Sequence, residues 1–415
     1  MPVIAVAAMQ QVEAGKISLD ADISRYVDLP LAKRIGGPIT VRELLTHTAG
    51  FADKMPIVSS SDLRSYLALN MPARVYPAGA LNSFSPYGMA LAAYIVERAA
   101  GESFAEYVRD RIFVPLGMTC TTMLQPAPTT LRCAPSQGYG PSTEPPLPPE
   151  TLAVALSLST SAADMGNFGA MLLDHGTLRG QRILSPKSVA TILSRQSAVS
   201  KDLSPNIPGM GLAFHEIWFN RASFFGQSGD TKAFHSEFDI DPQRKLVLFI
   251  TYNSSGHPGN SGEPSKLATF ARGELIHGIF DRYQPFHPTV IHAAPTAGQR
   301  RLATGTWIPA DEVELPFNPL HLIHSSIAPV GDALLVDRFL SDRGTVKHWS
   351  MLLPDLWQQY PQDLIEAIPG RGGLPDRLAL ASNPANQLVR VSTRTHEDKS
   401  IAIPRRVVHR LGQQE

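Results

Sequence analysis

Apolar residues fill almost every position of the first helical turns and predict a helix buried in a core. From Val3 to Val12 the segment has no continuous polar face, whereas a surface helix keeps one. No Ser, Thr, Asp or Asn stands ahead of it as a cap, and Gly15 is placed to end it. We therefore expect a core helix that begins without the usual N-terminal signal.

Capping residues predict further helices between residues 40 and 193. Thr40 and Glu43 have the spacing of a capping box at the start of a short helix. Further helices are predicted to start at Ser61, at one of Ser159, Thr160 and Ser161, and at Ser185 with Pro186. A long helix is predicted from Tyr87 to Ala100 with Gly101 as its stop, and the helix after it should end at Val114–Pro115. Residues 125–149 are rich in Pro, Thr and Ser and predict a long surface loop.

Beyond residue 209 the pattern becomes that of strands. Residues 209–219, 223–240 and 245–253 alternate or run apolar with β-branched and aromatic side chains, as consecutive antiparallel strands do. A last helix is predicted over 265–283, and residues 285–299 have the Pro- and Ala-rich composition of a linker. Short strand-like runs between Gly, Pro, Asp and Asn turns then predict a small β-barrel or sandwich. We accordingly divide the chain into residues 1–285 and 286–415.

Composition narrows the classes of function. Lys plus Arg and Asp plus Glu both number 37, so the chain lacks the electrostatic footprint of a protein that binds nucleic acid or an anionic membrane. No apolar run approaches the length of a membrane span, and no positive charge precedes the apolar opening as it would in a signal peptide. The sequence does not indicate the cellular compartment.

The two cysteines predict no disulfide framework. Cys120 and Cys133 are expected to be buried thiols, with one local bridge as the alternative.

Four stretches follow one another in a specific order. They are AVAAMQQVEAGKISLDADISRYV with ITVRELLTHTAGF, then residues 77–118, then residues 159–189, and then FGQSGDTKAFHSEFDIDPQRKLVLFITYNSSG. Together they resemble the serine β-lactamase and penicillin-binding-protein-like hydrolases, which include class C β-lactamases, D-aminopeptidases and carboxylesterases. The resemblance covers residues 1–285 and implies an α+β fold, with an antiparallel sheet flanked by helices and a helical subdomain beside it. The tail resembles the lipocalin-like β-domain of some members.

The resemblance implies acyl transfer through a serine ester. Such a site needs a Ser and a Lys one helical turn apart, a Tyr in a Y-x-N motif, and a K-T-G or H-x-G strand whose next amide supplies half of the oxyanion hole. The S-x-x-K motif should lie just ahead of Pro2, with Met1 at the place of the Lys, and no lysine of the chain has Ser or Thr three positions earlier. We therefore expect that the N-terminus is lost or that the start was placed too late.

The Y-x-N motif falls on Phe84-Ser85-Pro86. Phe84 keeps the ring of the tyrosine but has no hydroxyl, so it cannot act as a base or relay a proton. Pro86 cannot offer the amide of an Asn side chain. The second motif is therefore degenerate.

The third motif falls on Gln227-Ser228-Gly229, so a neutral amide stands where the family carries a His or Lys. Ser228 and Gly229 fit the pattern, and the Asp230 amide would be the surviving half of an oxyanion hole. The resemblance implies that Ser228, Gly229 and Asp230 line the substrate-binding cleft, together with His235, for which ordinary packing is the alternative. Ser228 is disfavoured as a nucleophile, because no activating His or Lys is apparent beside it.

The sequences around the other histidines favour structural roles for them. His47 in LLTHTAG is expected to be a structural histidine, and His215-Glu216 lacks the second His of a zinc-binding helix. No metal or cofactor is predicted. The competing functions are a catalytically dead protein that binds a small molecule or peptide, an active hydrolase with a mis-assigned start, and a chain whose C-terminal β-domain is the binding part. Phe84 and Gln227 favour a chain that forms no acyl-enzyme.

Overall fold

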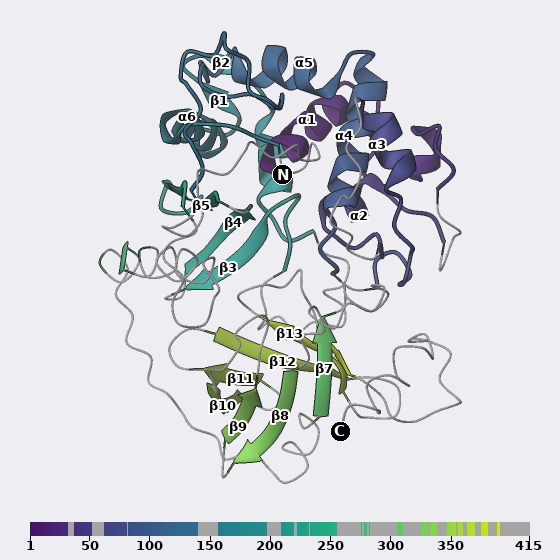
Figure 1. Ribbon diagram of the computed structural model, residues 1–415, viewed down its shortest axis with the longest axis vertical. Coiled ribbons are helices and arrows are strands. Elements are labelled where there is room, and N and C mark those ends of the chain that lie inside the picture. The colour runs from purple at the N-terminus through teal and green to yellow at the C-terminus, as the bar shows by residue number, and fades with distance from the viewer. Residues whose placement is uncertain are drawn as a thin grey trace.

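The computed structural model describes residues 1–31, 37–51, 62–80, 82–139, 157–196, 209–219, 222–231 and 233–254, helical positions at 275, 278, 279 and 282, and the backbone of strands between 305 and 390. The first part is built from helices around a four-stranded antiparallel sheet (Figure 1). The predicted linker, most of the helix over 265–283 and residues 140–149 of the predicted loop lie outside the described residues.

Helix α1 (Pro2–Glu13) confirms the predicted core helix. It has no side-chain cap at Met1, and Gly15 beyond its end has the left-handed φ of 69°. It packs against α4 (Pro86–Ala100), which ends at Gly101 with a φ of 78°, as predicted (Figure 1). Small side chains are fully buried along both helices, and they allow the two backbones to approach closely: Ala5, Ala7 and Ala8 on α1, and Ala90, Ala92 and Ala93 on α4.

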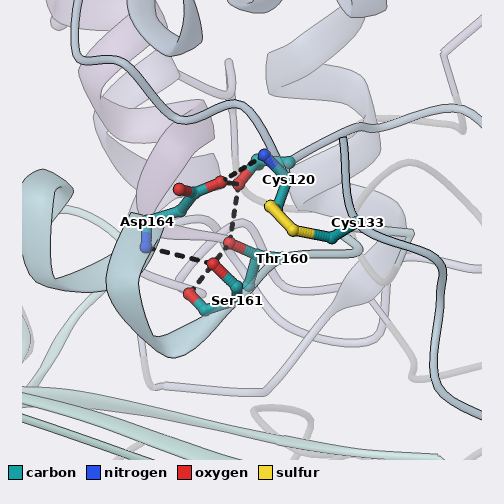
Figure 2. Close-up of a disulfide and its surroundings, with 6 residues drawn as sticks. Cys120, Cys133, Thr160, Ser161 and Asp164 are labelled. Atoms are coloured by element: carbon teal, nitrogen blue, oxygen red, sulfur yellow. Dashed lines mark hydrogen bonds between the residues drawn. A yellow bond between two sulfur atoms is a disulfide. The ribbon is translucent and has the colours of Figure 1, made fainter. Parts of the chain in front are cut away.

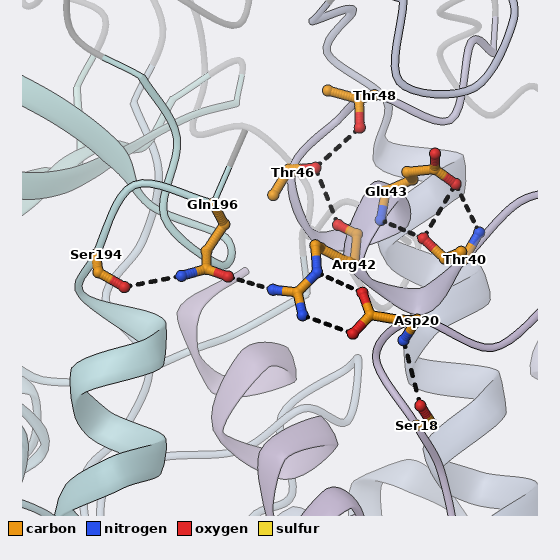
Figure 3. Close-up of polar contacts among 9 residues, drawn as sticks. All are labelled: Ser18, Asp20, Thr40, Arg42, Glu43, Thr46, Thr48, Ser194 and Gln196. Atoms are coloured by element: carbon orange, nitrogen blue, oxygen red, sulfur yellow. Dashed lines mark hydrogen bonds and ion pairs between the residues drawn. The ribbon is translucent and has the colours of Figure 1, made fainter. Parts of the chain in front are cut away.

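The capping box at the start of α2 (Val41–Leu45) is also confirmed. The Thr40 amide donates to Glu43 Oε2 at 2.7 Å, and the Glu43 amide donates to Thr40 Oγ1 at 3.2 Å. Figure 3 shows how Arg42 extends this corner: its guanidinium donates to both carboxylate oxygens of Asp20, at 2.7 and 2.9 Å, and to the Gln196 side chain. The first helices are thereby joined to the segment that follows α7 (Pro186–Ile192).

The remaining helices begin close to the predicted signals. Asp62 caps α3 (Leu63–Leu69), and the predicted cap Ser61 lies outside the described residues. Ser161 is the one of three candidates that caps α6 (Ala162–Leu173), and Ser185 caps α7. The other short elements are a 3-10 turn η1 (Ile23–Arg25), α5 (Phe104–Val108) and a π-helical turn η2 (Arg109–Phe113), which ends before Val114 as predicted.

The sheet consists of β3 (His215–Phe219), β4 (Ala222–Asp230), β5 (His235–Asp241) and β6 (Leu246–Tyr252), paired in chain order. The predicted segment 223–240 therefore holds two strands and a turn. Helix α6 covers one face, where the ring centroids of Phe168 and Phe238 lie 5.9 Å apart. Gly169 permits this contact, since a Cβ there would lie 2.6 Å from Val247 Cγ1.

A small hairpin follows α6 that the sequence pattern did not indicate. Strands β1 (Thr177–Leu178) and β2 (Gln181–Arg182) are joined by Arg179 and Gly180, whose φ angles are 49° and 80°. Two residues at positive φ make the tight turn that matches strand twist. Arg in that position is an uncommon signal, which is why the hairpin was missed.

Cys120 and Cys133 form a disulfide, with their Cα atoms 5.1 Å apart (Figure 2). The expectation of two buried thiols is therefore wrong, because Cys133 is exposed and Cys120 is half-buried. The bridge lies beside the N-terminus of α6, where Asp164 accepts a hydrogen bond of 2.8 Å from the Cys120 amide.

Eight strands in the C-terminal part pair in chain order and close into an antiparallel barrel. They are β7 (Gly305–Pro309), β8 (Ser325–Val330), β9 (Ala333–Asp337), β10 (Lys347–Leu353), β11 (Leu356–Gln359), β12 (Asp363–Pro369), β13 (Pro375–Leu380) and β14 (Leu388–Arg390). Within the described part of the chain, no helix has both the length and the apolar character needed to cross a membrane.

The contact of α6 with β6 can be tested by a matched pair of glycine substitutions. Gly169→Ala should lower the free energy of unfolding by about 1–3 kcal/mol, because its Cβ would overpack Val247. Gly166→Ala on the same helix meets nothing within 4 Å and should raise it by about 0.5–1 kcal/mol through helix propensity. Urea denaturation measures both; equal effects would show that α6 does not pack on Val247 in this way.

Candidate functional site

The segment Phe84-Ser85-Pro86 forms the entry to helix α4. Ser85 has an extended backbone and its Oγ accepts a hydrogen bond of 3.0 Å from the Gly88 amide, as an N-cap does. Pro86 takes the first helical position, where a missing N–H costs nothing. Ser85 and Pro86 are thus used to start the helix, and the half-buried Phe84 stands directly ahead of it.

His47 holds this segment in place. Its carbonyl oxygen accepts a hydrogen bond of 2.7 Å from the Ser83 amide, and its Nδ1 accepts one of 3.2 Å from the Ser85 amide. Its ring lies against Phe84, with the two centroids 4.8 Å apart. The structural role expected for His47 is therefore to hold the backbone on both sides of Phe84.

The two histidines near this segment are electrically neutral. Burial, reinforced by the charge interaction with His215, lowers the pKa of His47 to about 3. Burial also lowers the pKa of His215 to about 4. Because Nδ1 of a neutral His47 accepts the Ser85 hydrogen bond, its proton resides on Nε2, which has no hydrogen-bond partner among the described residues.

Gln227 lies on β4 and faces the helices. It is opposite Phe238 of β5, whose ring contacts Phe168, so the Gln227 side chain shares the sheet face that α6 covers. The side chain is buried, its Nε2 donates to the Ser228 carbonyl at 2.9 Å, and its Oε1 has no partner among the described residues. A buried neutral amide thus occupies the position expected to carry charge.

The end of β4 extends beyond its neighbour β3. The β3–β4 register ends at His215 opposite Gly226, whereas the β4–β5 register continues to Asp230 opposite His235. From Ser228 to Asp230 the residues are exposed, and the side chain of Ser228 points to the sheet face opposite that of Gln227. Among the described strands, this stretch of β4 is paired on one side only.

His235 is fully buried on the sheet face opposite Gln227. Its Nδ1 lies 2.7 Å from Asp230 Oδ1, and its Nε2 has no partner among the described residues. The contact anchors the Asp230 carboxylate at the turn between β4 and β5. His235 therefore does not share the face on which Gln227 lies.

His47 connects the Phe84 segment to the β3 side of the sheet. Its charge interaction is with His215, which pairs with Gly226, the neighbour of Gln227. Because residues opposite each other share a face, the His215 side chain leaves the sheet on the face opposite that of Gln227, and the register does not bring Phe84 and Gln227 together. The sequence did not identify His47 as the connecting residue, because its partners lie almost 40 residues later; its φ of 55° is visible only in the folded chain.

The donors needed for a metal centre are not gathered in the described part of the chain. No group of three or more His, Cys, Asp or Glu side chains is placed there to hold an ion. Glu216 accepts hydrogen bonds from Arg195 Nε at 2.7 Å and from the Gly209 amide at 2.9 Å, so its carboxylate is already engaged.

Comparisons with known proteins agree on one family. The family model Beta-lactamase matches residues 2–269. The chain is 28% identical over 262 residues to Penicillin-binding protein 4 of Amycolatopsis lactamdurans, a match that covers 60% of this chain and 69% of that protein. It is 34% identical over 144 residues to lovastatin esterase of Penicillium rubens, covering 28% of this chain and 35% of that protein.

A solved structure shows the same fold. The octameric penicillin-binding protein homologue from Pyrococcus abyssi aligns with a TM-score of 0.55 and 18% identity, over 94% of this chain and 86% of that one. Its sequence is too distant to indicate more than the fold. With a family model over most of the chain, the β4 site and the helices around it, this protein belongs to the serine β-lactamase and penicillin-binding-protein-like family.

Proposed function

We propose that the β-lactamase-related part of this chain binds a small molecule or peptide at the end of β4 and does not carry out acyl transfer. The observation that carries the proposal is the neutral site at Phe84 and Gln227. Neither side chain can take up a proton or present a positive charge at neutral pH. Both positions lie inside the chain, so residues ahead of Met1 would not alter either one.

His47 does not replace the missing base. Its Nδ1 already accepts the Ser85 amide, and its low pKa of about 3 makes it a poor proton acceptor at neutral pH. Loss of one general base typically costs 10²- to 10⁴-fold in rate. The neutrality of His47 therefore supports a site that holds a ligand without turning it over.

Ser228 does not offer an alternative nucleophile. Its hydroxyl makes no hydrogen bond with another described residue. The two histidines on its sheet face, His215 and His235, stand opposite Gly226 and Asp230 rather than opposite Ser228, and His235 is directed to Asp230. A serine needs a base within hydrogen-bond distance to become nucleophilic at neutral pH. The arrangement of Ser228, Asp230 and His235 supports anchoring of the strand end rather than catalysis.

The one-sided pairing of β4 supports an extended ligand. A strand end that is paired on one side only, as this one is among the described strands, can accept a peptide as an added strand. The buried amide of Gln227 beside it favours a ligand without a charged carboxylate. We further propose a domain boundary after residue 285 and a lipocalin-like character for the C-terminal part, supported by its closed meander of eight strands.

The absence of acyl transfer can be measured directly. The 415-residue chain should hydrolyse nitrocefin and p-nitrophenyl acetate no faster than buffer and should not be labelled by a fluorophosphonate probe, because no base activates a serine. Ser228→Ala is the matched control. Turnover with stoichiometric labelling would contradict the proposal, and its loss in the control would identify Ser228 as the nucleophile.

Ligand charge is tested with acetyl-D-Ala-D-Ala as the free acid and as the amide, a pair suggested by the resemblance to D-aminopeptidases. The unmodified chain should bind the amide at least as tightly as the acid. Gln227→Lys should shift the preference toward the acid by about 10-fold, since a charge-assisted hydrogen bond adds about 1.5–3 kcal/mol. Isothermal titration calorimetry measures both; a strong preference of the unmodified chain for the acid would overturn the inferred neutrality.

Stability should fall on mild acidification. His47 and His215 ionise near pH 3 and 4 when folded, but near 6.5 when unfolded. Below pH 6.5 the unfolded chain therefore binds more protons, and the free energy of unfolding decreases by about 1 kcal/mol per pH unit for each histidine.

A matched pair isolates the contribution of His47. His47→Asn, which tolerates the positive φ, should flatten the decrease between pH 6.5 and 4.5 by about a third, because His215 and the Met1 amino group, whose pKa burial lowers to about 5, also contribute. The exposed His175 has a φ of 53°, so His175→Asn is the control and should leave the slope unchanged. Urea denaturation across this range gives the slope. Identical slopes in both variants would show that His47 is not held neutral.

A further inference from the structure

The segment Cys133–Tyr139, here called the strap, crosses from the disulfide to the end of the sheet. At its far end the Tyr139 amide donates to the Asn253 carbonyl at 2.8 Å, and Asn253 Nδ2 donates to the Gln137 carbonyl at 3.0 Å. Asn253 directly follows β6. Two hydrogen bonds therefore hold one end of the strap against the sheet.

The strap lies on the turn between β4 and β5. A Cβ at Gly138 would stand 2.8 Å from Ala233 Cβ and 2.9 Å from Phe234 Cε2, so the strap backbone touches this turn directly. The turn begins at Thr231, immediately after the exposed end of β4. Tyr139 and Phe234 keep 46% and 37% of their surface exposed. Phe234 thus stands at the turn that closes the end of β4, whereas Tyr139 stands at the end of β6, beside Ser254.

In the described part of the chain, the disulfide is the bond that fixes the other end of the strap. Cys120 is firmly placed, because Asp164 accepts hydrogen bonds from its amide at 2.8 Å and from the Thr121 hydroxyl at 2.7 Å (Figure 2). Among the hydrogen bonds of the described residues, none joins residues 133–136 to another element. Cys133 is an exposed residue, whereas Cys120 is half-buried.

We propose that the strap is a wall of the ligand site that the Cys120–Cys133 disulfide holds closed and that reduction by a dithiol opens. In this step a thiolate of the dithiol attacks Cys133 Sγ and displaces Cys120 as a thiolate. The second thiol then releases Cys133, which gives two protein thiols and one cyclic disulfide of the reductant. The attachment of the strap by the disulfide, here called the tether, does not depend on the proposed function. The role of the strap as a wall of the ligand site rests on the proposed function.

The size of the effect follows from chain entropy. The bridged cysteines are 13 residues apart, and a cross-link over a loop of this size restricts the open state by on the order of 100-fold. Reduction should therefore increase the population of the released strap by about 10- to 100-fold, while the hydrogen bonds at Asn253 and the bridge between Tyr139 and Ser254 still hold its other end.

Hydrogen exchange read by mass spectrometry tests the tether on the full chain. With dithiothreitol, the Tyr139 amide should exchange at least 10-fold faster than in the oxidised protein, while the Gly101 amide, which donates to Glu97 in α4, should not change. The double variant Cys120→Ser, Cys133→Ser should exchange rapidly with or without dithiothreitol. A Tyr139 amide that is equally protected after thiol titration proves reduction would overturn the proposal, as would general acceleration that includes Gly101.

A binding experiment tests whether the strap forms a wall of the ligand site. Affinity for acetyl-D-Ala-D-Ala-amide should fall by 10-fold or more on reduction and in Tyr139→Ala, and be retained in Tyr139→Phe. Unchanged affinity in the reduced protein and in Tyr139→Ala would overturn the role as a wall. Failure of the peptide to bind in either redox state would count against the proposed function, while the exchange data would still decide the tether.

Discussion

The packing of α1 on α4 is the constraint from which the site follows. Fully buried alanines on both helices bring the backbones together, so neither helix can shift without opening a void or a clash in the core. Because α4 is fixed along its length, its first turn is fixed as well, and with it the N-cap Ser85 and the ring of Phe84. His47 holds the segment just ahead of this turn through two hydrogen bonds: its carbonyl accepts from the Ser83 amide and its Nδ1 accepts from the Ser85 amide.

The substitutions at the site are mutually consistent in their electrostatics. A buried site excludes charge unless each charge has a partner. His47 is kept neutral by burial, Phe84 has no ionisable group, and Gln227 carries a neutral amide. A lysine at residue 227 would enter a buried position, whereas glutamine satisfies part of its hydrogen bonding locally, through the Ser228 carbonyl.

Local signals were sufficient to predict the helices but not all of the strands or the disulfide. The capping box at Thr40, the stop at Gly101 and the cap at Ser185 depend on neighbours within four residues, and the structure confirms them. Strands β11, β12 and β13 have no clear signal in the sequence, because LWQQ, DLIEAIP and PDRLAL lack the alternation of β-branched residues that indicates a strand. The disulfide depends on how residues 120–133 fold back, and spacing alone does not determine that.

The two-residue period of the sheet determines which side chains of the site can meet. Gln227 and His235 belong to adjacent strands, but Gln227 is opposite Phe238 and His235 is opposite Asp230, so their side chains leave the sheet on different faces. Of the residues expected in the cleft, Ser228, Asp230 and His235 share one face, whereas the motif position Gln227 lies on the other. The motif positions follow from the sequence, but the strand register does not. His235 lies 2.7 Å from the Asp230 carboxylate at the turn that the strap covers, so it supports the end of β4.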